Sequence, residues 1–103
     1  MKLTSPHYQS AVAMIRVLAE QRGTDYEFSC HASVEMQDDD IDPLDIRNAL
    51  LRAETAREQN DSGVITYLVH GRDTEQRRIA MVIEVEEFPP SIFVITVWKV
   101  TRR

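Results

Sequence analysis

The chain has 103 residues, of which 43% are hydrophobic and 7% aromatic, so it is long enough for one compact domain and too short for two. Its formal net charge is −5, but residues 1–63 hold 12 acidic and 6 basic residues (net −6), whereas residues 64–103 hold 5 acidic and 6 basic residues (net +1). This balance excludes a protein with a basic surface throughout, and only a local basic patch in the second part can attract nucleic acid.

No apolar stretch reaches the roughly 18–20 residues that a membrane-spanning helix needs, and the start MKLTSPHYQ lacks the apolar region of a signal peptide. The single cysteine, Cys30, cannot form an internal disulfide. These features predict a cytoplasmic protein with no membrane partner. Paired cysteines, a histidine pair at helical spacing and a glycine-rich phosphate loop are all missing from the sequence, so we expect neither a metal nor a cofactor.

The first part of the chain, residues 1–54, has the pattern of helices. Residues 4–6 (Thr-Ser-Pro) combine a hydroxyl cap with a proline suited to the first helical position. Apolar residues recur at helical spacing from Tyr8 onward, and Gly23 ends this helix. Residues 24–28 then form a connector with, at most, a short extended segment.

Two further helices follow, each preceded by a capping residue. Ser29 can cap a short helix over residues 30–37, and Asp42, followed by a proline, can cap a third helix whose apolar residues extend to Ala53. The first half is therefore predicted to be helical.

The second half, residues 55–103, changes to the alternation that is typical of strands. Four strands are expected, at residues 55–59, 64–70, 79–85 and 92–97. The last two flank Phe88-Pro89-Pro90-Ser91 and should pair as a hairpin, with Ile79, Met81, Ile83 and Val85 on one face. The predicted fold class is α+β: a single domain, residues 1–103, with N-terminal helices packed on one face of a four-stranded twisted antiparallel sheet.

A run of aspartates follows the second predicted helix and continues into the third. Its members are Asp38, Asp39, Asp40, Asp42 and Asp45. The run lacks the alternating ligands and central glycine of a calcium loop, so a solvated loop is expected rather than a metal site. If these residues form one exposed face, they offer a contact surface for a basic protein partner. The exposed edge of the strand at residues 55–59 is a second place where a partner strand or another copy can bind.

Cationic and aromatic residues of the sheet half are candidates for chemistry on a phosphate. Arg78 lies among apolar strand residues, and beside Tyr67, His70, Arg72 or Lys99 it can bind phosphate or stabilise developing negative charge. Trp98 can stack on a base, although a tryptophan at the end of a strand more often serves packing. His31 can present its ring at the edge of the sheet, although a lone histidine more often has a structural hydrogen bond.

Several short motifs resemble those of a known family. They are Phe28-Ser29-Cys30-His31-Ala32, Met36, Ile41, His70-Gly71-Arg72 and Val94-Ile95-Thr96-Val97-Trp98. They are similar to a widespread group of small bacterial proteins classed as a domain of unknown function, with an S-x-H-A-x-x-R-M helix and a terminal T-V-Y/W strand. Its members look like compact relatives of the RelE/ParE and BrnT toxins of type II toxin–antitoxin pairs. In this chain Glu35 stands where that helix has arginine.

The resemblance implies a RelE-like fold and, in the toxin branch, a metal-independent ribonuclease that an antitoxin neutralises. It implies His31 as the general acid or base, with Arg78 and Lys99 binding the phosphate, and these side chains must then converge on one face. Further candidates for RNA binding are Tyr67, Arg72 and Trp98. The alternative is a non-catalytic acidic module, antitoxin-like or an inhibitor, whose helical half binds a basic partner.

Overall fold

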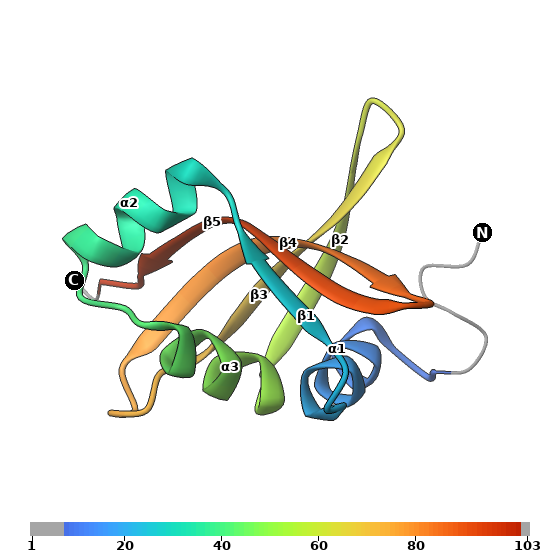
Figure 1. Cartoon of the computed structure of the whole chain (residues 1–103), viewed down its shortest axis with the longest axis horizontal. Coiled ribbons are helices and arrows are strands. Elements are labelled where there is room, and N and C mark those ends of the chain that lie inside the picture. Colours follow the sequence, from blue (N-terminus) through green and yellow to red (C-terminus); the bar gives the residue numbers. More distant parts are fainter. Residues whose placement is uncertain (1–7, 102–103) are drawn as a thin grey trace.

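The fold consists of three helices and a five-stranded sheet, as seen in a computed structural model that describes residues 8–101 (Figure 1). The helices are α1 (Ala11–Glu20), α2 (Cys30–Asp38) and α3 (Pro43–Leu51), and the strands are β1 (Asp25–Phe28), β2 (Thr55–Asp61), β3 (Val64–Arg72), β4 (Arg78–Glu87) and β5 (Pro90–Lys99). Within residues 8–101, no helix is long and apolar enough to cross a membrane.

The sheet is mixed, with the strand order β1-β5-β4-β3-β2. Strands β2 to β5 pair antiparallel as predicted, whereas β1 pairs parallel to β5, with Tyr26 opposite Ile92. The prediction of a four-stranded, purely antiparallel sheet is therefore wrong in one strand and one pairing. Strand β1 lies in residues 24–28, which were expected to be a connector with, at most, a short extended segment. It forms because it supplies hydrogen bonds to the edge of β5 while Tyr26 and Phe28 pack against the core.

Two of the three helix starts agree with the sequence prediction. Helices α2 and α3 begin directly after the N-caps Ser29 and Asp42, which confirms both capping signals. Helix α1 begins at Ala11 after a different N-cap, Ser10. The predicted start at residues 4–6 lies outside the described residues.

The core lies between the sheet and two helices, α1 and α3, which cover one of its faces (Figure 1). In β4 the side chains of Ile79, Met81 and Ile83 are fully buried on this covered face and Val85 is partly buried, which confirms the predicted alternation. Helix α3 comes so close to β3 that a Cβ on Gly71 would lie 2.5 Å from the carbonyl oxygen of Ala49.

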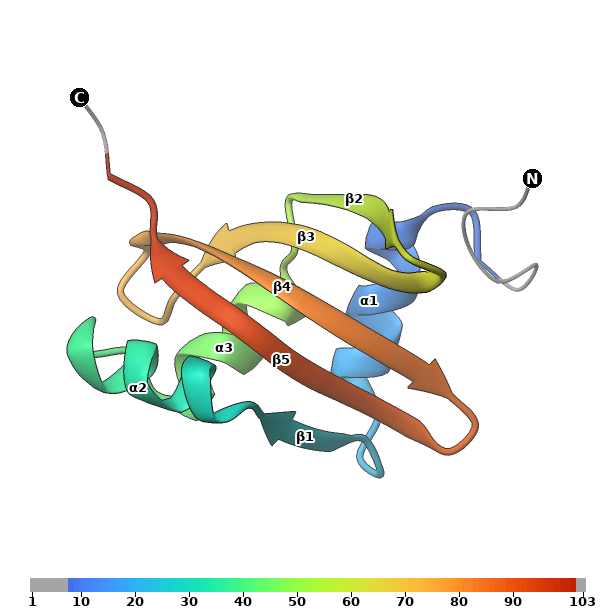
Figure 2. The ribbon, with the colours of Figure 1, turned by 90° about the horizontal axis from the view of Figure 1, so that it is seen from above.

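The opposite face of β3, β4 and β5 has no described segment over it (Figure 2). We call it the open face. Cross-strand register and alternation assign to it, from the three central strands, Thr66, Leu68, His70, Arg72, Arg78, Ala80, Val82, Glu84, Glu86, Ser91, Phe93, Thr96 and Trp98.

The segment from Ser29 through α2 covers the edge of β5 beyond the end of β1. Four of its polar groups bond to backbone groups of β5. Ser29 donates from its backbone N–H to Val94 O (3.0 Å) and from Oγ to Ile95 O (2.6 Å), while Glu35 Oε1 accepts from Val97 N (3.0 Å) and Asp39 Oδ2 from Lys99 N (3.4 Å). Acidic side chains of a helix therefore replace a neighbouring strand along this edge. The two edge strands of the sheet are β1 and β2.

Candidate functional site

Four side chains gather at one end of the open face. Arg72 of β3 and Arg78 of β4 are direct cross-strand partners, His70 is opposite Ala80, and Ala80 is opposite Trp98. Residues paired across antiparallel strands carry their side chains on the same face, with Cβ atoms about 4.5–5.5 Å apart. His70, Arg72, Arg78 and Trp98 therefore form one group, which we call the basic cluster.

The two arginines of the basic cluster differ in the hydrogen-bond and ion-pair partners of their guanidinium groups. Arg72 donates from Nε to Glu54 Oε2 (3.1 Å) and from a terminal nitrogen to the carbonyl oxygen of Gln76 (3.0 Å). Arg78 is exposed, and among residues 8–101 it has no ion pair. Like charges placed directly opposite each other in a sheet repel, so an anion bound between these guanidinium groups would be favourable.

His70 is the histidine that the fold places beside these cations. Its Nδ1 lies 3.3 Å from Thr55 Oγ1, and the tautomer that donates from Nδ1 leaves Nε2 free to act as a base. The ring of Trp98 is 37% exposed in the same row of the sheet. The sequence indicates His70 only as a neighbour of Arg78, although its position two residues before Arg72 in a strand is a signal that both share a face.

Two other predicted site residues lie on the covered face. Tyr67, a candidate for RNA binding, is only 6% exposed, because it alternates with the open-face residues of β3 and points toward the core. Lys99 is the cross-strand partner of the buried Ile79, so it too belongs to the covered side. Neither side chain joins Arg78 on the open face.

His31 lies at the start of α2, beside the edge of β5. Its Nε2 is 3.3 Å from Glu35 Oε2, and 71% of its side chain is exposed. Glu35 accepts hydrogen bonds from Thr96 Oγ1 (2.5 Å) and Val97 N (3.0 Å). Burial alone would raise the pKa of Glu35, but these hydrogen bonds and the charge of His31 lower it below its ordinary value. Glu35 thus fixes α2 to the sheet, and His31 sits outside the basic cluster.

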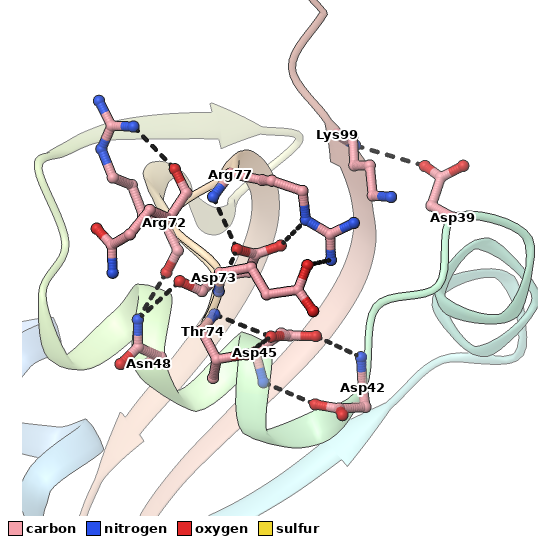
Figure 3. Close-up of polar contacts among 11 residues, drawn as sticks. Asp39, Asp42, Asp45, Asn48, Arg72, Asp73, Thr74, Arg77 and Lys99 are labelled. Atoms are coloured by element: carbon pink, nitrogen blue, oxygen red, sulfur yellow. Dashed lines mark hydrogen bonds and ion pairs between the residues drawn. The ribbon is translucent and has the colours of Figure 1, made fainter.

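The aspartate run divides among several structural roles (Figure 3). Asp42 caps α3, Asp39 accepts from the backbone of β5, and the side chains of Asp38 and Asp40 are exposed. Asp45 is buried instead, so it cannot belong to the exposed, partner-binding face that the sequence predicted. The physical reason is the capping box of α3, in which Asp45 accepts a hydrogen bond from the backbone N–H of Asp42 (3.1 Å).

The loop between β3 and β4 is held by a second buried carboxylate, Asp73 (Figure 3). Its Oδ1 accepts hydrogen bonds from the backbone N–H groups of Glu75 and Arg77, each at 2.8 Å, and its Oδ2 accepts one from Arg77 Nε at 2.6 Å. Asn48 of α3 donates to the carbonyl oxygens of Arg72 (2.9 Å) and Asp73 (3.2 Å). This loop separates the two arginines of the basic cluster, so these contacts fix the ends of both strands.

Asp45 makes the fold sensitive to acid. Burial alone would raise the pKa of Asp45, but hydrogen bonds from Thr74 and Asp42 and the charge of Arg77 lower it below its ordinary value. The folded state therefore binds fewer protons than the unfolded state, and this stabilisation is complete above about pH 4 and is lost as the pH falls through the folded-state pKa.

We accordingly expect the free energy of unfolding, measured by urea titration between pH 7 and pH 2.5, to fall at the acidic end. Asp45→Asn should lower stability at neutral pH and flatten this decline. Asp38→Asn, a change at an exposed aspartate, should leave the profile as in the wild type. An Asp45→Asn profile parallel to that of the wild type would show that Asp45 does not contribute.

No group of three or more histidine, cysteine, aspartate or glutamate side chains within the described part of the chain is arranged to hold a metal ion. Residues 28–99 match the model of a family described as a domain of unknown function, DUF4258. The match runs from the end of β1 to the end of β5, and so includes α2, α3 and the basic cluster. It confirms the resemblance to a domain family of unknown function, whereas the relation to RelE, ParE and BrnT toxins stays a prediction. No curated protein matches this sequence significantly.

Proposed function

We propose that this chain, which belongs to the DUF4258 family, is a toxin-like protein that binds RNA on its open face and cleaves it. The observation that carries the proposal is the basic cluster, where two arginines in direct cross-strand register lie beside a histidine and a tryptophan. A phosphodiester fits between the arginines, and a neighbouring base can stack on the indole ring. The local charge of this cluster is compatible with an acidic chain because the acidic residues are concentrated elsewhere.

His70 is the only side chain in the cluster whose neutral form has a ring nitrogen that can accept a proton. Its Nε2 takes the proton of a ribose 2′-hydroxyl, the 2′ oxygen bonds to the adjacent phosphorus, and the bond from phosphorus to the 5′ oxygen breaks. The leaving 5′ oxygen takes a proton from water, and His70 returns its proton to the solvent. Arg72 and Arg78 stabilise the negative charge that develops on the phosphate oxygens. The products are a 2′,3′-cyclic phosphate and a 5′-hydroxyl, and this route uses no metal ion.

In this mechanism His70 is the general base and His31 has no role, and this difference can be measured. Purified wild-type protein should cleave an RNA oligonucleotide in the presence of EDTA and leave a cyclic phosphate end. His70→Ala should lower the cleavage rate by about 100-fold or more, because a general base of this kind contributes about that much. Arg78→Ala should lower it by about 10- to 100-fold, whereas His31→Ala should have a small effect.

The matched control for Arg78→Ala is Arg22→Ala, which removes an exposed arginine outside the open face. Induction in bacteria gives a second readout, since wild-type protein should arrest growth and His70→Ala should not. Folded wild-type protein that neither binds nor cleaves RNA would reject the proposal, and loss of cleavage in His31→Ala with full activity in His70→Ala would move the catalytic role to α2.

A second candidate function is the acidic module that binds a basic protein partner. The observation in its favour is a groove of about 430 Å³ beside α2 and the start of α3, with Met36 and Ile41 in its lining and Asp40 and Asp42 among its polar groups. An aliphatic stem with a cationic end, such as a lysine or arginine side chain of a partner, suits that combination. A basic peptide that binds wild-type protein but not Asp40→Lys would support this candidate.

A further inference from the structure

The end of the open face away from the basic cluster carries the opposite charge. Phe93 of β5 lies between two glutamates in one row of the sheet, Glu84 of β4 and Glu27 of β1. Together with Glu86 they line a hollow of about 280 Å³. Within residues 8–101 these three glutamates have no ion pair. We call Glu27, Glu84 and Glu86 the acidic cluster.

Between the charged ends the open face is largely apolar. The middle row pairs Leu68 with Val82 and Val82 with Thr96, and the next row contains Ala80 between His70 and Trp98 of the basic cluster. Helices α1 and α3 cover the other side of the sheet, and α2 lies beside the edge of β5, where Glu35 bonds to Thr96 (Figures 1 and 2). The side chains of β3 and β4 in the middle of the open face therefore lack the cover that an apolar strand face normally receives. An apolar centre with charged ends is the composition of a contact surface.

Strand β4 shows this polarity within its own sequence. Its open-face residues are, in order, Arg78, Ala80, Val82, Glu84 and Glu86. Arg78 and Glu86 lie four residues on either side of Val82, which places each about 13 Å from it along the strand. A two-fold axis above Val82, parallel to the sheet and perpendicular to β4, therefore exchanges the positions of the arginine and the glutamate along the strand.

We infer that a second copy of this chain covers the open face. The two sheets pack face to face about 10 Å apart, as in β-sandwiches, with Arg78 of each copy opposite Glu86 of the other. The same axis places Trp98 of one copy over the region of Phe93 of the other, since these two residues lie one row from the middle on either side. The interface is isologous: each charged end meets its complement, and the apolar centre meets itself.

The pairing has a consequence for activity, and this consequence rests on the proposed function. A dimer of this kind hides the basic cluster, so RNA and the second copy compete for one surface. Cleavage per chain should then fall as the protein concentration rises through the dissociation constant of the dimer. RNA addition should convert the dimer into a complex with one chain per RNA.

The experiment is sedimentation velocity of the full chain, without RNA, over a series of concentrations. Arg78→Glu and Glu86→Arg each place like charges opposite one another, so each should raise the dissociation constant of the dimer by at least about 10-fold. The double variant, Arg78→Glu with Glu86→Arg, restores opposite charges with the ends exchanged and should return the dissociation constant close to that of the wild type. The matched control, Arg52→Glu, changes an exposed arginine at the end of α3 and should have no effect.

Three results would overturn the inference: a wild type that stays monomeric at high concentration, single variants that dimerise like the wild type, or a double variant that dimerises no better than the single ones. A dimer that Gln59→Pro in β2 abolishes while the charge variants leave it intact would assign the association to the strand edge instead. Because no RNA is present, a failure of the ribonuclease proposal leaves this result unaffected. Circular dichroism spectra of all variants establish that they are folded.

Discussion

Replacing Asp73 by alanine should lower the free energy of unfolding by about 3 kcal/mol. The carboxylate has no exposed surface and accepts three hydrogen bonds: from the backbone N–H groups of Glu75 and Arg77 and from the Arg77 side chain. Alanine removes all three acceptor contacts and leaves two backbone donors in a loop that is folded around the missing group. The loop would then release the ends of β3 and β4, which carry the two arginines of the basic cluster.

Urea titration at pH 7 gives the stability of Asp73→Ala relative to the wild type. The control is Glu75→Ala in the same loop, whose side chain is 72% exposed and which should change stability by no more than about 0.5 kcal/mol. If Asp73→Ala and Glu75→Ala have equal stability, the buried carboxylate does not hold the loop.

Replacing Gly71 by alanine should lower the free energy of unfolding by about 3 kcal/mol, through crowding and not through loss of a contact. A Cβ at this position would lie 2.5 Å from the carbonyl oxygen of Ala49 and 3.0 Å from its Cα. Both are backbone atoms of α3, so the new methyl group cannot be accommodated by turning a side chain. Either α3 moves away from the sheet or β3 bends, and each change opens the core around Val69 and Ile46.

The chain supplies a matched control for Gly71→Ala. Gly23 has no atom within 4 Å of the position of an added Cβ and does not adopt the left-handed backbone conformation, so Gly23→Ala should leave stability within about 0.5 kcal/mol of the wild type. Thermal unfolding followed by circular dichroism compares the two alanine variants directly. Equal melting temperatures would mean that the contact between α3 and β3 leaves room for a methyl group at residue 71.

The sequence signals that succeeded were local ones. The N-caps Ser29 and Asp42 located two helices, because a side-chain oxygen that satisfies free N–H groups acts within one helical turn. The alternation of β4 was clear because only one of its faces is continuously apolar. The sequence suggested at most a short extended segment at residues 24–28, and the place of β1 in the sheet was missed. Its four residues are too few to show a period, and its pairing depends on β5, about 65 residues later in the chain.

The residues of the basic cluster were harder to predict. Which residues of β3 and β5 face the helices depends on the neighbouring strands, and the sequence of each strand alone does not decide it. In β3 and β5 both faces contain apolar residues, so the sequence does not show which side meets the helices. In β5 the register also shifts, since Val82 pairs with Thr96 whereas Ile83 pairs with Val94. This β-bulge reverses the alternation after Val94 and thereby turns Trp98 to the open face and Lys99 to the covered face. A prediction that continues the alternation without the bulge reverses both.

The α2 segment that covers the edge of β5 also limits where another strand can join this sheet. Strand β1 pairs only with Ser91 to Val94 of that edge, and beyond it Glu35 and Asp39 occupy the backbone donors of Val97 and Lys99. An incoming strand can therefore pair with the outer side of β1 or of β2, but not with the C-terminal half of β5. Substitutions that detach α2 would open this part of β5 as a further site for strand addition and so favour growth of the sheet from one copy to the next.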